Sequence, residues 1–213
     1  MNVNIWGPPA WDLLQSCAFI LDAQKKKDTN LFSLLIELLP CVHCRNSYKI
    51  FYEETMNRPV MDHSMFCYTV HSLVNEKLFR QRLEKLVPNV SSEQFIKLKP
   101  LMDQPSFLVV QKRFAVNSDE PISFRSLTVF LLSLCMAWET QEEKKSLLQQ
   151  FIYELKNIAN MINNQKLVAF LDELVRKKSI AEMKNVILLK KYGNGPNPSE
   201  YIRAGSCFNG TCK

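Results

Sequence analysis

Apolar residues recur at the spacing of an amphipathic helix, and this pattern limits the possible folds more than any other feature of the chain. In the first 21 residues they fall three or four positions apart, at Ala10, Leu13, Leu14, Cys17, Ala18 and Leu21. The alternation typical of strands is scarce, and only "SFLVVQKRF", from Ser106, could form a short strand. Only 5 of the 213 residues are glycine and leucine is abundant, which also favours helix over sheet. We expect an all-α protein.

Four helices with short connections are predicted in residues 1–86. After the first helix, "LFSLLIELL" is apolar on nearly every side, so we expect a buried helix. Pro40 suits the first turn of a third helix that runs to about residue 54. A fourth helix is expected over about 62–85. Four such helices predict a small four-helix bundle as the first domain.

The chain after residue 86 predicts a second, mainly helical domain over 87–191, whose role the sequence does not indicate. "SSEQ" is a capping box with Ser91 as N-cap. Five helices are expected there: 91–99, 105–115, 123–140, 143–163 and 165–191. The most apolar run, "LTVFLLSLCMAW", is shorter than the roughly 20 residues of a membrane span, so we expect a buried core helix instead. Residues 192–213 are rich in Gly, Pro and Asn and predict a flexible tail.

The formal net charge is +6 and lies wholly in the second half. Residues 1–84 carry nine of the 27 Lys and Arg and nine of the 21 Asp and Glu, so the later part has eighteen against twelve. This excess is mild and no nucleic-acid motif accompanies it, so it does not favour nucleic-acid binding.

No signal peptide is seen, which predicts a cytoplasmic location and argues against a general disulfide framework for the seven cysteines.

Cys41 and Cys44 form a C-x-x-C pair at the start of the third predicted helix. Unpaired N–H groups and the helix dipole favour a thiolate there, and two thiols one turn apart can form a disulfide and exchange two electrons. The alternative is a zinc site, because Cys41, Cys44, Cys67 and His71 read C-x2-C-x22-C-x3-H. Such a site would belong to a helical binding module. These residues lie within helical patterns rather than on knuckle-like turns, and we expect no metal.

Two further patterns flank this pair. "WGPPAW", from Trp6 to Trp11, places two tryptophans around a Gly-Pro-Pro turn just before the first helix. His71 and Asn75 lie one turn apart on the fourth helix, where a ring can stack on a planar ligand and an amide can bind its edge. Taken alone, each pattern also fits ordinary core and surface residues.

In this order and at these spacings, W-G-x-x-x-W, C-x-x-C and H-x-x-V-N-x-K-L resemble the Erv/ALR family of flavin-linked sulfhydryl oxidases. The resemblance covers about residues 5–82. It implies a four-helix bundle that holds FAD, with Cys44 beside the flavin and Cys41 exchanging with an incoming dithiol. Cys67 lies one position from the family's structural cysteine, and we expect it to be free. Cys17 and Cys135 lie in apolar helical patterns and are expected to be inert.

The resemblance also implies a set of FAD contacts. Trp11 and His71 would pack on the cofactor rings, Asn75 would bind the adenine, and Lys77 would serve the phosphate side. Gln15 stands where the family usually has a histidine. The full expected set is Trp6, Gly7, Trp11, Gln15, His71, Asn75, Lys77 and Arg80.

Many such oxidases carry a second cysteine pair on a flexible segment, and "CFNGTC" places Cys207 and Cys212 across an Asn-Gly turn-former. We expect this pair to carry electrons from reduced protein dithiols to Cys41 and Cys44, with oxygen as the final acceptor and hydrogen peroxide as product. The resemblance also implies a homodimer. The chain starts at the first motif and carries a large helical extension. In these two features it is more similar to the oxidases of large DNA viruses than to the mitochondrial or secretory members. This implies a location in the host cytoplasm or the virion.

Overall fold

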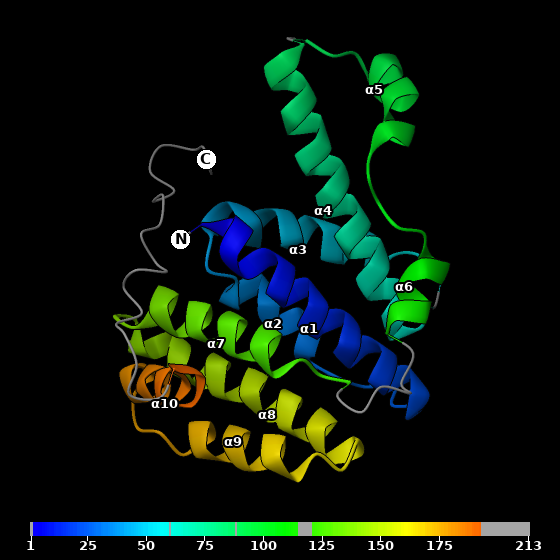
Figure 1. The fold of residues 1–213 in the computed structure, drawn as a ribbon. Coiled ribbons are helices and arrows are strands. Elements are labelled where there is room, and N and C mark those ends of the chain that lie inside the picture. The colour runs from blue at the N-terminus through cyan, green and yellow to red at the C-terminus, as the bar shows by residue number, and fades with distance from the viewer. Residues whose placement is uncertain (1, 60, 88, 115–120, 193–213) are drawn as a thin grey trace.

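The computed structural model describes residues 2–59, 61–87, 89–114 and 121–192 (Figure 1). These residues form ten α-helices and two short 3₁₀ helices, and no strand occurs among them. The α-helices are α1 (Val3–Ala23), α2 (Leu31–Leu38), α3 (Val42–Met56), α4 (His63–Leu86), α5 (Ser92–Leu98), α6 (Phe107–Arg113), α7 (Phe124–Trp138), α8 (Lys145–Met161), α9 (Gln165–Val175) and α10 (Ile180–Tyr192). The predicted all-α fold is confirmed, and the stretch from Ser106 is helical rather than extended.

Helix α1 begins earlier than the sequence predicted. Asn2 is its N-cap and accepts a hydrogen bond from the backbone N–H of Asn4 at 2.9 Å. Pro8 and Pro9 therefore lie inside the helix, and the expected turn before the first helix is wrong. Pro8 and Pro9 are the sixth and seventh residues of α1, so neither can donate to the carbonyl four residues earlier, and the helix forms despite the loss of these two backbone hydrogen bonds.

Helix α3 begins later than predicted. Pro40 is not in its first turn, because Cys41 is the N-cap residue and the helix starts at Val42. A residue before proline is driven out of the helical region, and Leu39 accordingly has φ −53° and ψ 135°. The connection between α2 and α3 is therefore extended and leads directly into the C-x-x-C pair.

The capping box at Ser91 is confirmed, with hydrogen bonds between Ser91 and Gln94 in both directions. The single helix predicted over 165–191 is wrong, because the chain turns between α9 and α10. Ser179 Oγ accepts from the N–H of Glu182 at 3.2 Å, and the Glu182 carboxylate accepts from the N–H of Lys178 at 3.0 Å. These bonds cap a new helix start that interrupts the continuous apolar pattern.

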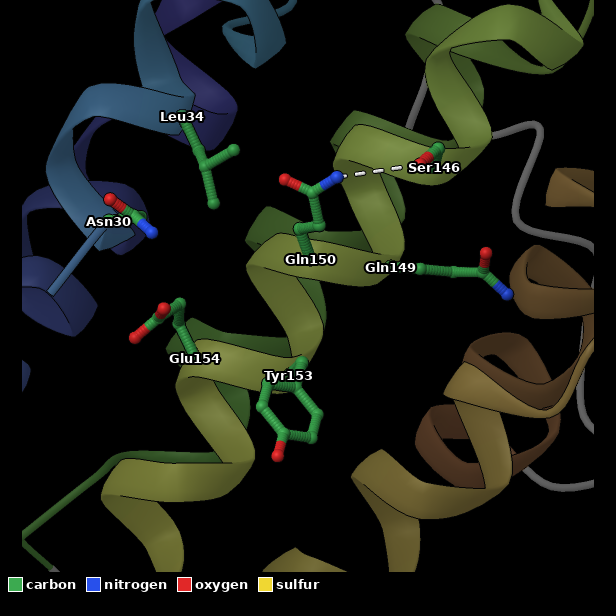
Figure 2. Close-up of a pocket in the computed structure, with 7 residues that line it drawn as sticks. All are labelled: Asn30, Leu34, Ser146, Gln149, Gln150, Tyr153 and Glu154. Atoms are coloured by element: carbon green, nitrogen blue, oxygen red, sulfur yellow. Dashed lines mark hydrogen bonds between the residues drawn. The ribbon is translucent and has the colours of Figure 1, made fainter.

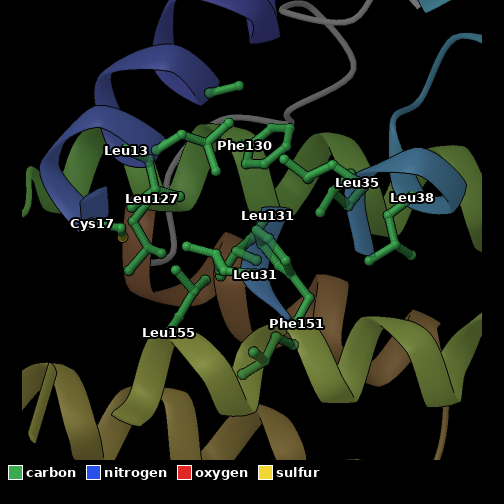
Figure 3. Packing of buried hydrophobic residues seen from close by; sticks show 14 of the residues in the cluster. Leu13, Cys17, Leu31, Leu35, Leu38, Leu127, Phe130, Leu131, Phe151 and Leu155 are labelled. Atoms are coloured by element: carbon green, nitrogen blue, oxygen red, sulfur yellow. The ribbon is translucent and has the colours of Figure 1, made fainter. Parts of the chain in front are cut away.

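Helix α1 packs against α4 on one side and α7 on another, while α8 packs against α2 and α9. Buried residues from α1 to α4 and from α7 to α10 form one hydrophobic cluster, in which Leu13 and Cys17 of α1 meet Leu127 and Phe130 of α7 (Figure 3). The boundary expected between residues 86 and 87 coincides with the end of α4, but helices on both of its sides share this core. Of the described helices, none is both long and apolar enough to cross a bilayer.

The start of α4 is capped by another helix. Asp62 is its N-cap residue but makes no side-chain capping hydrogen bond. Instead, the carboxylate of Asp22, in the last turn of α1, accepts from the backbone N–H groups of His63 and Ser64, each at 2.9 Å. This contact joins the end of α1 to the start of α4. From there α4 extends away from the rest of the molecule toward α5 (Figure 1).

Candidate redox and cofactor site

The C-x-x-C pair spans the N-terminus of α3. Cys41 is the N-cap residue, with extended backbone (φ −109°, ψ 126°), and its carbonyl accepts from the N–H of Arg45 at 2.9 Å. Cys41 is only 5% exposed, whereas Cys44 is half-buried. The unpaired N–H groups and the positive end of the helix dipole favour a thiolate at this helix start, whereas the burial of Cys41 opposes it.

Three other cysteines have a different environment. Among the described residues, Cys17, Cys67 and Cys135 are free and buried. Burial raises the pKa of both Cys17 and Cys135 to about 12 and raises the pKa of Cys67 further. A thiol with so high a pKa carries almost no thiolate at neutral pH, so these three side chains are unreactive core residues. This agrees with the inert role expected for Cys17 and Cys135 and with the free state expected for Cys67.

Trp11 and His71 lie against each other between α1 and α4. Their ring centroids are 4.3 Å apart and their planes differ by 17°. Gln15 Nε2 donates to His71 Nδ1 at 3.1 Å, which leaves the ring proton on Nε2. Burial lowers the pKa of His71 to about 4, so the imidazole is neutral at physiological pH. The structure thus gathers three of the predicted cofactor residues into one flat, uncharged group.

A hydrogen bond connects α4 to the cysteine helix. Lys77 Nζ donates to Ser47 Oγ, and Ser47 lies three residues after Cys44 on α3. Residues three apart on a helix share a face. Asn75, one turn after His71, is half-buried on the same helix as Lys77. Ser47 was not predicted as a site residue, because nothing in the sequence around a helical serine indicates that it bonds a lysine on another helix.

The remaining predicted cofactor residues are Trp6, Gly7 and Arg80. Trp6 is buried and stacks on Phe130 of α7 at 6.2 Å, and its Nε1 has no hydrogen-bond partner within the described part of the chain. Gly7 has room for a β-carbon, which would meet the Val3 side chain at 3.7 Å. The Arg80 guanidinium lies over a ring of α5, 4.0 Å from the centroid of Phe95. Trp6 and Arg80 thus pack on other rings, whereas Gly7 lies one turn before Trp11 on the same face of α1.

A flavin nucleotide needs aromatic surface for its rings, amide groups for their edges and a cation for its phosphates. Trp11, His71 and Gln15 are of the first two kinds, and Lys77, which donates to Ser47, is the expected cation. Because Trp11 and His71 are in direct contact, a planar group fits against the outside of the pair rather than between the two rings.

The predicted zinc ligands are not gathered. Within the described residues, no group of three or more His, Cys, Asp or Glu side chains could hold a metal ion. Cys67 is buried, and the Nδ1 of His71 already accepts from Gln15.

A pocket lies at a distance from these motifs, between the start of α2 and one face of α8. Figure 2 shows that its walls are mainly polar side chains of α8, among them Gln150 and Glu154. None of its lining residues belongs to the three motifs.

Cys207 and Cys212 lie outside the described residues. Comparisons of the chain with protein-family models, curated proteins and solved structures find no match.

Proposed function

We propose that this protein is an FAD-dependent thiol oxidase that forms disulfide bonds in protein substrates. The observation that carries the proposal is the meeting of three motifs from separate parts of the sequence. The Trp11–His71 stack joins α1 to α4, and the bond from Lys77 to Ser47 joins α4 to the helix of Cys41 and Cys44. In this proposal, the thiols of Cys41 and Cys44 lie beside this uncharged aromatic surface, as such an oxidase requires.

Disulfide exchange at the C-x-x-C pair begins with its oxidised form. A substrate thiolate attacks the sulfur of Cys41, and the Cys44 thiolate leaves. The second substrate thiol then loses its proton and attacks the mixed disulfide, which releases Cys41 and leaves the substrate oxidised. The pair has now gained two electrons and two protons. Bound FAD would accept the two electrons and pass them to oxygen, which gives hydrogen peroxide.

The exposure of the two cysteines bears on their roles. Cys41 is the more buried cysteine of the pair, although we assign it to exchange with substrate. The two roles follow the family that the motifs resemble, and the Cys41→Ser and Cys44→Ser variants test them.

The test is the cofactor itself. Full-length protein, purified without added flavin, should be yellow and should release FAD on denaturation, with about one FAD per chain by chromatography. It should consume oxygen when dithiothreitol is added. Colourless protein that holds one zinc ion per chain would instead support a zinc-stabilised helical module.

We further propose that Cys207 and Cys212 relay electrons from protein substrates. Changing both to serine should spare most oxidation of dithiothreitol, which is small enough to reach the pair at α3 directly, and should slow oxidation of a reduced protein at least about tenfold, because the direct route is sterically restricted. Equal rates toward the protein substrate in both forms would favour direct attack on Cys41. The homodimer, the cytoplasmic location and the viral origin stay predictions.

A further inference from the structure

The backbone just before the C-x-x-C pair is held from two sides. Trp138, at the end of α7, donates from Nε1 to the carbonyl of Leu38 at 2.8 Å. Arg45, in the first turns of α3, donates from Nη1 to the carbonyl of Leu39 at 2.6 Å. The carbonyls of the last residue of α2 and of the residue after it are thus both bound. One of the two donors, Trp138, lies 97 positions after Cys41 in the sequence.

The two donors also contact each other. The Arg45 guanidinium carbon lies 4.7 Å from the centre of the Trp138 ring, and Lys144 Nζ lies 5.3 Å from it. Lys144 also forms an ion pair with Glu37 at 2.9 Å. The hydrogen bond and charge of Lys144, and to a smaller degree the charge of Arg45, lower the pKa of the Glu37 carboxyl. We name these four side chains, Glu37, Arg45, Trp138 and Lys144, the Trp138 cluster.

The position of Cys41 depends on this connection as well as on α3. Cys44 lies within the helix, so intrahelical hydrogen bonds place its backbone. Cys41 is the N-cap residue: its carbonyl is held by the N–H of Arg45, but its torsions are extended and its N-terminal side is held only by the connection. A disulfide tolerates only a narrow range of separations and angles. A small change at Leu39 would therefore change how well the two sulfurs can bond.

We propose that Trp138 and Arg45 are positioning residues for the C-x-x-C pair. By fixing the connection before Cys41, they stabilise the disulfide form and set how readily it is reduced. This inference rests on the proposed function, because it assumes that the pair cycles between dithiol and disulfide. It also gives part of residues 87–191 a role, because α7 supplies one of the two donors.

The experiment measures the thiol–disulfide equilibrium rather than turnover. Full-length protein is equilibrated without oxygen in a series of glutathione buffers, quenched with acid and alkylated. Trypsin releases residues 28–45, a peptide whose only cysteines are Cys41 and Cys44. Its mass gives the oxidised fraction at each buffer ratio, with no contribution from the other five thiols.

Trp138→Phe keeps an aromatic ring but lacks the N–H donor. It should shift the equilibrium constant about fivefold toward the dithiol, the size expected for one hydrogen bond. Arg45→Lys keeps the charge and the trypsin site but loses the planar donor group, and should shift it in the same direction. Because both act on one connection, the double variant should shift it by less than the product of the single effects.

The control is Phe170→Leu on α9. Phe170 is buried in the same hydrophobic cluster but packs on Phe124, away from the α2–α3 connection. It should lower thermal stability and leave the equilibrium constant unchanged. An equal shift in this control, or wild-type constants in both variants of the Trp138 cluster, would overturn the inference. If Trp138→Phe does not fold, the thiol–disulfide equilibrium constant of Arg45→Lys tests the inference by itself.

Failure of the proposed function has a different signature. A wild-type pair that stays reduced in every buffer would overturn both proposals. A wild-type pair that cycles, with variants that match it, would overturn only the role of Trp138 and Arg45.

Discussion

Helix α1 has two interfaces of opposite character. Toward α7 it presents Leu13 and Cys17, which join Phe130 in an apolar core with almost no exposed surface (Figure 3). Toward α4 it presents Trp11, which stacks on His71, and the buried amide of Gln15, which donates to the same ring. The first interface offers stability and no reactive group. The second offers rings, an amide and a neutral imidazole. One helix can therefore support the fold and the site because the two tasks lie on different faces.

The largest expected effect is on the chemistry. Cys44→Ser should abolish oxidation of dithiothreitol and remove any charge-transfer absorption between a thiolate and bound flavin, whereas Cys41→Ser should abolish turnover but keep that band. Cys17→Ala, on the apolar face of α1, should retain turnover per bound FAD and lose only some thermal stability. Continued oxidation by Cys44→Ser would break the contrast between reactive and core thiols.

The next effect is on stability, at the α1–α7 interface. Phe130→Ala removes a fully buried ring and should lower the free energy of unfolding by about 3–5 kcal/mol, because it leaves a cavity in the shared core. Urea denaturation measures this loss. Tyr153→Ala, at a site 53% exposed, should change stability by less than about 0.5 kcal/mol. A loss below about 1 kcal/mol for Phe130→Ala would show that this interface is not the stabilising one.

The α1–α4 interface should be sensitive to acid. The pKa of His71 falls from 6.5 to about 4 on folding because of burial, so the unfolded chain binds a proton that the folded chain does not. The contribution of neutral His71 is complete above pH 6.5 and is lost as the pH falls toward 4. Between pH 7 and 4.5 we expect a loss of about 2 kcal/mol from this group. His71→Phe should lack this component, and identical pH dependence in both proteins would contradict the assignment.

The smallest effect concerns Gly7, in the second turn of α1 beside Trp6. A methyl group there meets Val3 at an ordinary contact distance, which allows a gain in helix propensity. Gly7 precedes Pro8, however, and a β-carbon on a residue before proline disfavours the helical conformation. The two effects oppose each other, so Gly7→Ala should change the free energy of unfolding by less than about 0.5 kcal/mol. Thermal unfolding measures the change, and FAD content in the same variant tests whether the cofactor needs the glycine. A change above about 1 kcal/mol would contradict this balance.

Much of the fold could be predicted because apolar spacing and caps are local signals. The periodicity of α1 and the capping box at Ser91 are both visible in a few consecutive residues. The break before α10 was visible too, because Ser179 and Glu182 have the spacing of a capping box, but the continuous apolar pattern masked it. The early start of α1 was missed because the two prolines were interpreted as a turn.

The candidate site was less predictable. The resemblance indicated Trp11, Gln15 and His71, and the structure gathers them, but nothing local shows that the two rings contact each other. Trp6 and Trp11 are both tryptophans, but residues five apart on a helix lie on different faces, so Trp6 packs toward α7 instead. Trp138 could not be connected to Cys41 from the sequence, because its hydrogen bond crosses 100 residues and depends on how α7 packs.

The capping of α4 by Asp22 has a consequence for the order of folding. The first turn of α4 has no side-chain cap of its own, so the N–H groups of His63 and Ser64 are satisfied only once the end of α1 has arrived. Amide hydrogen exchange at these two positions should therefore report the separation of two helices rather than local fraying of one. In kinetic terms, the N-terminal turn of α4 should form late, after the chain between residues 22 and 63 has closed its loop.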